Sequence, residues 1–135
     1  MAVDVTAQVN IARDPQTVWD YMTDPANEPE WIGGLKTSRL LGDAPLRLGS
    51  RVERLAGFLG RKIEYVNEVT ELDPPRTLDM KSVKAPFPMH ITYTLEGDRE
   101  TTVRNHVRGG GPRLSAPLVR RSVQKDLERL RDILT

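Results

Sequence analysis

The sequence predicts a single α+β domain over residues 1–135, with an antiparallel sheet of about seven strands, two short helices after the first strand, and a long C-terminal helix. Three observations predict it. They are an alternating N-terminal segment followed by two helix-start signals, a central run of strand-like segments separated by turn residues, and helical periodicity near the C-terminus. A chain of this length can bury a sizeable core.

The N-terminal segment, residues 3–11, alternates valine, alanine and isoleucine with polar residues, which is the period of a half-buried strand. An Asp-Pro pair at 14–15 then places a side-chain acceptor at a helix N-cap and a proline in the first turn, and the pair at 24–25 repeats this pattern. We expect a short helix after each pair, the second ending near Trp31.

The central part of the chain has the composition of strands and little helical periodicity. Gly-Asp and proline-rich segments separate the apolar runs, as turns do. Consecutive strands joined by short turns are typical of an antiparallel meander. The predicted strands lie near residues 35–41, 50–58, 61–72, 76–83, 88–96 and 100–108.

A glycine-rich connection at 109–112 precedes the C-terminal segment. From Leu114 to Leu134, leucine and valine recur every three or four residues, while arginine, lysine and glutamate fill the remaining positions. This pattern predicts one long amphipathic helix with Ser115 as a candidate cap. Pro117 fits the first turn of this helix, or else marks a kink there.

Composition narrows the classes of function. The formal charge of +1 gives no reason to expect a nucleic-acid partner. Without cysteine there is no disulfide, thiolate nucleophile or zinc-thiolate site, and two histidines make a metal site unexpected; we predict no cofactor. No apolar run is long enough for stable membrane insertion, so a cytoplasmic protein is the expectation.

The order of these elements, together with local sequence, resembles the START-like superfamily, specifically its polyketide cyclase/dehydrase-like (SRPBCC) branch. The resemblance spans residues 3 to 134 and is carried by IARDPQTVWDYMTDP, Trp31, LGSRVER and FLGRKIEYVNEVTELDPPRTL, followed by the terminal amphipathic helix. It implies the helix-grip fold, in which a curved antiparallel sheet wraps around the C-terminal helix. It also implies a cavity between sheet and helix that suits an apolar or amphipathic small molecule.

Strand alternation predicts which side chains face that cavity, because successive residues point to opposite faces of a sheet. In residues 88–96, for example, Met89, Ile91 and Tyr93 share the apolar face. We expect the polar members of the set to orient a ligand, or else to bond one another or buried water. The candidate ligand-binding residues are Trp31, Tyr65, Asn67, Met80, Met89, Ile91, Tyr93, Asn105, Val119 and Val123.

The hairpin between the last two strands decides which face the last strand presents, because a slip of one residue exchanges the two faces. A three-residue loop ending at Arg99 sets Val103 opposite Tyr93 and keeps the apolar residues together, so we favour it. A tighter two-residue turn would bring Arg104 and His106 inward instead.

The charged candidates are weaker. Arg51 and Arg54 fall on opposite faces of one strand, so one of them is a candidate to enter the cavity and favour a carboxylate or enolate ligand. Whether Arg54 or Arg104 enters is left open by the sequence. His90 and His106 are expected to be solvated on the polar face, and no catalytic residue can be assigned.

The resulting functional expectation is a protein that binds a polyketide, lipid or aromatic metabolite in its cavity. The alternative is an enzyme of the polyketide cyclase, aromatase or dehydratase type. A second alternative is an interaction module with a closed cavity. Ligand identity, pathway and the choice between monomer and homodimer are left open by the sequence.

Overall fold

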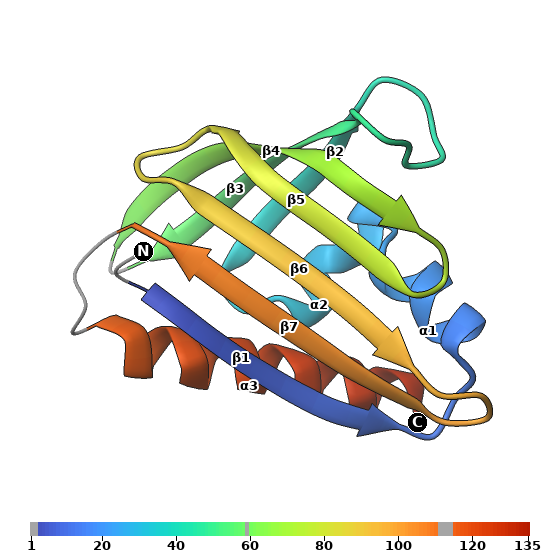
Figure 1. Cartoon of the computed structure of the whole chain (residues 1–135). Helices are drawn as coiled ribbons and strands as arrows, with labels where there is room; N and C mark the ends of the chain where they lie inside the picture. The colour runs from blue at the N-terminus through green and yellow to red at the C-terminus, as the bar shows by residue number, and fades with distance from the viewer. Residues whose placement is uncertain (1–2, 59, 111–114) are drawn as a thin grey trace.

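The computed structural model describes residues 3–58, 60–110 and 115–135 (Figure 1). Its seven strands and three α-helices follow the predicted order. The elements are β1 (Val3–Ile11), α1 (Pro15–Met22), a 3-10 turn η1 (Pro25–Asn27), α2 (Glu28–Trp31), β2 (Leu35–Leu41), β3 (Arg51–Phe58), β4 (Arg61–Asp73), β5 (Thr77–Lys84), β6 (Met89–Glu96), β7 (Thr101–Gly109) and α3 (Ala116–Leu134).

The sheet has the order β1-β7-β6-β5-β4-β3-β2, and every neighbouring pair is antiparallel. Figure 1 shows the sheet curving over α3, which runs alongside β1, while α1 and α2 occupy the gap between the two edge strands. This is the helix-grip fold, and the predicted fold class is confirmed.

The two Asp-Pro pairs begin helical segments as predicted. Asp14 accepts a hydrogen bond from the Thr17 backbone N–H at 3.2 Å, and Asp24 accepts one from the Ala26 N–H at 3.0 Å. The second segment is divided into η1 and the single turn α2. Both segments are short and lie between β1 and β2 in the chain, where they occupy the gap between these two strands (Figure 1).

The predicted pairing of Val103 with Tyr93 is wrong, although the predicted faces are right. Tyr93 pairs with Asn105 and Val103 pairs with Leu95. The connection begins at Gly97, whose positive φ of 125° suits a glycine, and it is longer than the loop we expected. The resulting shift of two residues, being even, leaves the same side chains facing inward.

The core lies between the concave face of the sheet and the helices. From α3 it takes Leu127 and Leu130, both fully buried, whereas Val119 and Val123 nearer the start of the helix are half-buried. Pro117 lies in the first turn, as predicted, and Ser115 is the N-cap residue. The predicted helix start at Leu114 and part of the glycine-rich connection lie outside the described residues.

Candidate functional site

A short helix turns two large side chains into the interior. Glu28 and Trp31 begin and end α2, and their i, i+3 spacing places both on its buried face. The indole ring of Trp31 meets the ring of Tyr93 on β6 edge-to-face, with centroids 6.1 Å apart and an interplanar angle of 67°.

A buried ion pair lies beside the two rings. Arg54 on β3 donates from Nε and Nη2 to the two carboxylate oxygens of Glu28, at 3.0 and 2.8 Å, and both residues are about 5% exposed or less. Ser38 on β2 donates its hydroxyl to the same carboxylate. Arg54 Nη2 also lies 3.8 Å from the sulfur of Met80, which places the pair within the predicted ligand region.

The ion pair answers the question that the sequence left open about arginine. Arg54 points inward, while Arg51 pairs with Glu68 on the outer face and Arg104 pairs there with Glu96. Sequence reasoning did not find Glu28, because its partner is 26 residues away. Burial acts against the charge of Arg54, but the nearby Glu28 carboxylate raises its pKa overall.

Two tyrosines face the same interior with their hydroxyl groups protonated. Burial raises the pKa of Tyr93 far above its ordinary value, and the Glu28 carboxylate adds to this effect. Burial also raises the pKa of Tyr65, against the opposing effect of Arg54. Each tyrosine therefore remains a neutral hydrogen-bond donor and acceptor at physiological pH.

Several interior polar atoms have no hydrogen-bond partner within the described part of the chain. They are both amide atoms of Asn67, the amide oxygen of Asn105, and the indole nitrogen of Trp31. Asn67 is completely buried, and Asn105 is 6% exposed. Most buried polar groups in proteins are bonded, so a group of them without partners calls for a physical explanation.

The ten predicted ligand residues divide into two sets by exposure. The first set is buried: Trp31, Asn67, Met80, Tyr93 and Asn105. The second set is half-buried: Tyr65, Met89, Ile91, Val119 and Val123. The strand register places members of both sets on the concave side of the sheet. Their role in ligand binding stays a prediction.

An acidic residue missed by sequence reasoning joins the site from α3. Asp126 accepts a hydrogen bond at 2.9 Å from the N–H of Gly33, in the loop after α2, and lies 3.3 Å from Arg129 Nη1. Arg129 also donates to the Trp31 carbonyl at 2.7 Å, so two α3 side chains hold this loop. Burial raises the pKa of Asp126 to about 6.

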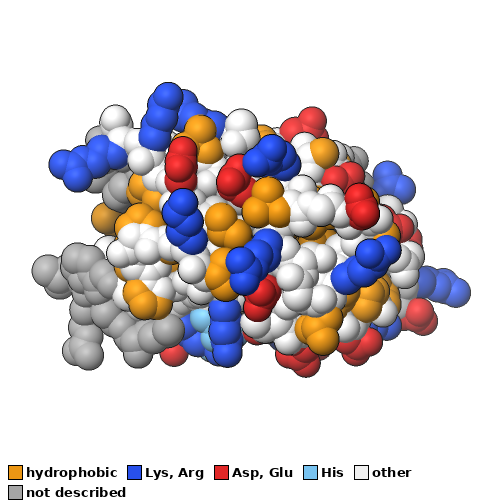
Figure 2. Space-filling view, turned by 90° about the horizontal axis from the view of Figure 1, so that it is seen from above, with side chains coloured by type: hydrophobic (Ala, Val, Ile, Leu, Met, Phe, Trp, Pro, Cys, Tyr) orange, Lys and Arg blue, Asp and Glu red, His pale blue; other side chains and the backbone are white. Residues whose placement is uncertain are grey.

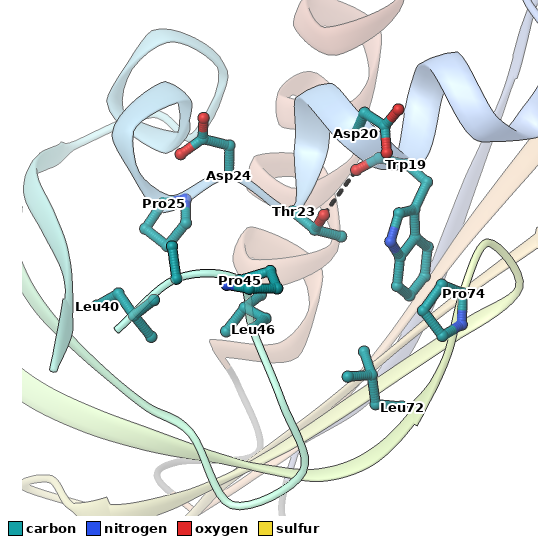
Figure 3. A pocket seen from close by; sticks show the side chains of 11 residues that line it. Trp19, Asp20, Thr23, Asp24, Pro25, Leu40, Pro45, Leu46, Leu72 and Pro74 are labelled. Atoms are coloured by element: carbon teal, nitrogen blue, oxygen red, sulfur yellow. Dashed lines mark hydrogen bonds between the residues drawn. The ribbon is translucent and has the colours of Figure 1, made fainter. Parts of the chain in front are cut away.

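A pocket of about 410 Å³ lies apart from the ten predicted residues (Figure 3). It is bounded by α1, η1, the loop after β2 and the turn after β4, and none of the ten lines it. Trp19 forms one wall, and the other lining residues are Asp20, Thr23, Asp24, Pro25, Leu40, Ala44, Pro45, Leu46, Leu72 and Pro74.

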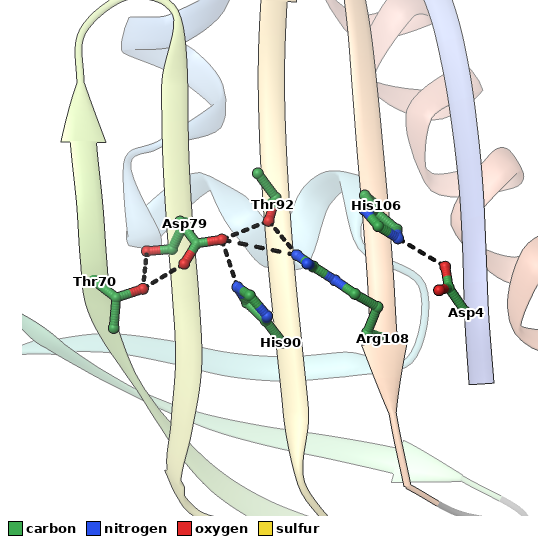
Figure 4. Close-up of polar contacts among 7 residues, drawn as sticks. All are labelled: Asp4, Thr70, Asp79, His90, Thr92, His106 and Arg108. Atoms are coloured by element: carbon green, nitrogen blue, oxygen red, sulfur yellow. Dashed lines mark hydrogen bonds and ion pairs between the residues drawn. The ribbon is translucent and has the colours of Figure 1, made fainter. Parts of the chain in front are cut away.

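The outer face of the sheet carries a separate polar cluster (Figure 4). Asp79 on β5 accepts hydrogen bonds from the hydroxyls of Thr70 and Thr92, and its Oδ1 lies 2.7 Å from His90 Nε2. Arg108 donates to Thr92. Burial raises the pKa of Asp79, but these hydrogen bonds together hold it below its ordinary value. The cluster joins β4, β5, β6 and β7.

The expectation of a solvated histidine on the outer face holds for His106 but only in part for His90. His90 is largely buried, with its side chain 20% exposed, and His106 lies 2.7 Å from Asp4 on β1. They do lie on the outer face, but each contacts a carboxylate on a neighbouring strand. These contacts form because strand pairing brings residues that are remote in sequence together.

The surface gives little further indication of a partner. On the face shown in Figure 2, basic, acidic and apolar side chains are mixed. Among the described residues, no helix combines the length and apolar content that crossing a bilayer requires. The same residues contain no group of three or more histidine and acidic side chains placed to hold a metal ion.

Solved structures with this fold come from several bacteria. A protein of Thermus thermophilus is 17% identical with a TM-score of 0.82, over 97% of this chain and 96% of that one. The Zhui aromatase/cyclase of a Streptomyces species is 15% identical with a TM-score of 0.76, over 97% and 92% of the two chains. A START superfamily protein of Mycobacterium smegmatis is 17% identical with a TM-score of 0.72, over 97% and 93%.

These likenesses establish the fold and agree with the predicted START-like resemblance. No curated protein sequence matches the chain. The sequence model of one family, described as polyketide cyclase / dehydrase and lipid transport, matches residues 2–135. Since that match covers nearly the whole chain, the protein belongs to the polyketide cyclase / dehydrase and lipid transport family.

Proposed function

We propose that the protein binds an amphipathic small molecule between the concave face of the sheet and the first half of α3. One observation carries this proposal: Asn67 is completely buried, and neither of its amide atoms has a partner in the described structure. A buried amide without hydrogen bonds destabilises the fold by about 1–3 kcal/mol. A ligand that accepts from and donates to this amide removes that penalty.

The exposure of apolar side chains supports the same region. Ile91 and Val107 pair across β6 and β7 on the concave face, yet both are half-buried, as is Val123 on α3. At the other end of the same face, Leu95 and Val103 are fully buried. Apolar side chains that face inward and keep exposed area suit the contact surface of an apolar ligand.

The polar groups then define how a ligand is oriented. Tyr93 and Tyr65 offer hydroxyl groups, and the Trp31 indole offers an N–H that has no partner among the described residues. A mostly apolar site with a small number of polar groups is the usual arrangement for recognising small molecules with hydroxyl or carbonyl oxygens. A polyketide, an aromatic metabolite or a lipid with such oxygens fits this chemistry, in line with the family description.

A cyclase or dehydratase activity is the second candidate. Asp126 favours it, because a carboxyl group with a pKa of about 6 exchanges protons readily near neutral pH, and its charge acts on both Tyr65 and Tyr93. In this alternative, Asp126 moves a proton while the tyrosines position a ketone. Its observable is turnover of a polyketone that Asp126→Asn abolishes while binding is retained.

Native mass spectrometry of freshly purified protein, followed by extraction and identification of any retained molecule, tests the binding proposal directly. In parallel, N-phenyl-1-naphthylamine serves as an uncharged fluorescent probe. We expect a thermal shift corresponding to about 2.7 kcal/mol at a hundredfold excess over Kd. No retained molecule together with no probe binding would leave the interaction module with a closed cavity as the better account.

Two substitutions locate the site. Tyr93→Phe removes one hydroxyl and Asn105→Leu removes one amide from the proposed region. We expect each to weaken binding of the extracted molecule by roughly tenfold, the size of one lost hydrogen bond. Unchanged affinity in both variants would remove these residues from the site.

A further inference from the structure

We propose that the Glu28–Arg54 ion pair makes the interior site selective for uncharged ligands over their anionic counterparts. This inference rests on the proposed binding function and names the class of ligand that the site takes. It reverses the expectation attached to an inward arginine, which by itself favours a carboxylate or an enolate.

The geometry of the pair supports this selectivity. The Nε and Nη2 atoms of Arg54 each donate to one carboxylate oxygen of Glu28, at 3.0 and 2.8 Å. The charge of the guanidinium is therefore already neutralised within the protein. Both side chains are about 5% exposed, which makes the attraction between them strong and little screened by solvent. An anionic ligand would have to compete with Glu28 for Arg54 and leave a buried carboxylate unpaired.

The other described polar groups of the site offer an anion hydrogen-bond donors but no positive charge. Asn67 and Asn105 are amides, Trp31 offers a neutral N–H, and Tyr65 and Tyr93 keep their protons. Among the described residues, the remaining ionisable group that acts on both tyrosines is Asp126, itself an acid and held beside Arg129. A charge buried without a partner is strongly disfavoured, whereas a neutral hydroxyl or carbonyl can bond to the amides.

The pair also lies where a ligand would meet it. Arg54 Nη2 contacts the sulfur of Met80 at 3.8 Å, and the charges of Glu28 and Arg54 both act on Tyr65 and Tyr93. Glu28 reaches this position because α2 turns it inward together with Trp31. Glu28 is therefore the specificity-determining residue, and Arg54 is its counter-charge.

Two molecules of equal shape test the proposal: 2-naphthamide is neutral and 2-naphthoate is anionic at pH 8. The affinity of each is measured by displacement of N-phenyl-1-naphthylamine from the wild-type protein, at low and high salt to separate out attraction by surface charges. We expect the amide to bind roughly tenfold more tightly or better. Equal or tighter binding of the carboxylate would overturn the selectivity but leave the binding function standing.

The variant Glu28→Gln then identifies the cause. It frees the charge of Arg54 while keeping a side chain of similar size, so we expect the preference to shift toward the carboxylate by roughly tenfold. The matched control is Glu53→Gln, on the exposed face of the same strand as Arg54, where Glu53 pairs with Arg39; the preference should not change. An unshifted preference in folded Glu28→Gln would contradict the role of Glu28.

The outcomes remain separable if the variant is unstable. If Glu28→Gln does not fold, the ratio of the two wild-type affinities still decides the selectivity. If the wild-type protein neither retains a molecule nor binds N-phenyl-1-naphthylamine, the proposed binding function fails, and the inference fails with it.

Discussion

At Asn67, stability and ligand binding place opposite demands on one side chain. Its amide is completely buried without a partner among the described residues, so Asn67→Leu should raise the free energy of unfolding of the ligand-free protein by about 1 kcal/mol. The same change should weaken binding of N-phenyl-1-naphthylamine or of the extracted ligand. Urea unfolding and a fluorescence titration measure the two effects.

The control for this prediction is Asn10→Leu. Asn10 is exposed on the outer face of β1, where it accepts a hydrogen bond from Thr102. The substitution is the same, but it should leave ligand affinity unchanged and give no gain in stability. Should Asn67→Leu destabilise the protein while binding persists, the amide has a structural role instead.

The raised pKa of Asp126 predicts that the free energy of unfolding depends on pH with a definite sign. Its pKa is raised from 3.8 to about 6 in the folded protein, so the folded state holds this proton more tightly than the unfolded state does. Stability should therefore fall as the pH rises from about 4 to 6, by roughly 2 kcal/mol from this group. Asp126→Asn should lack this decrease while keeping the oxygen that accepts from Gly33.

The measurement is urea unfolding of the wild-type protein and Asp126→Asn at pH 4.5 and pH 7. The other titrating groups are common to both proteins, so the difference between their pH dependences isolates Asp126. Parallel curves would show that the carboxyl group titrates as it does in the unfolded chain.

Among the elements, α2 contributes two buried side chains to the site although it is only four residues long. One helical turn presents both a carboxylate and an indole to the interior, and two α3 side chains hold the loop that follows it. Local patterns indicate that Glu28, Trp31 and Arg54 face inward, but they do not indicate that Glu28 and Arg54 meet. Glu28 and Trp31 have the i, i+3 spacing of one helix face, and Arg54 has the parity of buried Val52 on the same strand.

The helix α3 has two halves that differ in what they bury. Leu127→Ala removes a fully buried side chain in the second half and should lower the free energy of unfolding by about 3 kcal/mol. Leu118→Ala makes the same change at a position that is 64% exposed and should have little effect. Urea unfolding of both variants measures the contrast; equal losses would mean that the first half packs as closely as the second.

At the scale of the whole molecule, the outer polar cluster links β4, β5, β6 and β7, the strands whose concave face lines the proposed site. Asp79 contacts residues on β4 and β6 and lies 3.9 Å from Arg108 on β7. Asp79→Ala leaves these donors without their acceptor, so it should lower the free energy of unfolding by about 3 kcal/mol.

His106→Ala provides the comparison on the same face. It breaks the contact with Asp4, but both side chains are more than a third exposed, so the loss should be under about 1 kcal/mol. Thermal and urea unfolding of both variants measure the difference. A small effect of Asp79→Ala would show that the strand pairing is sufficient without the cluster.

The sequence by itself determined the order of the elements, the faces of the strands and the side chains that point inward. These follow from local rules: Asp-Pro pairs begin helices, alternation assigns faces, and a spacing of three to four residues marks α3. Even the register error between β6 and β7 kept the faces, because the shift was even.

Only the tertiary structure decided which partners the charged side chains meet. Glu28 with Arg54, Asp126 with Gly33, and Asp79 with His90 are each brought together by chain segments that are remote in sequence. Such contacts depend on how a curved sheet and its helices pack, and no local pattern encodes them. The inward faces could therefore be predicted, but the electrostatic character of the interior, and with it the proposed preference for an uncharged ligand, required the fold.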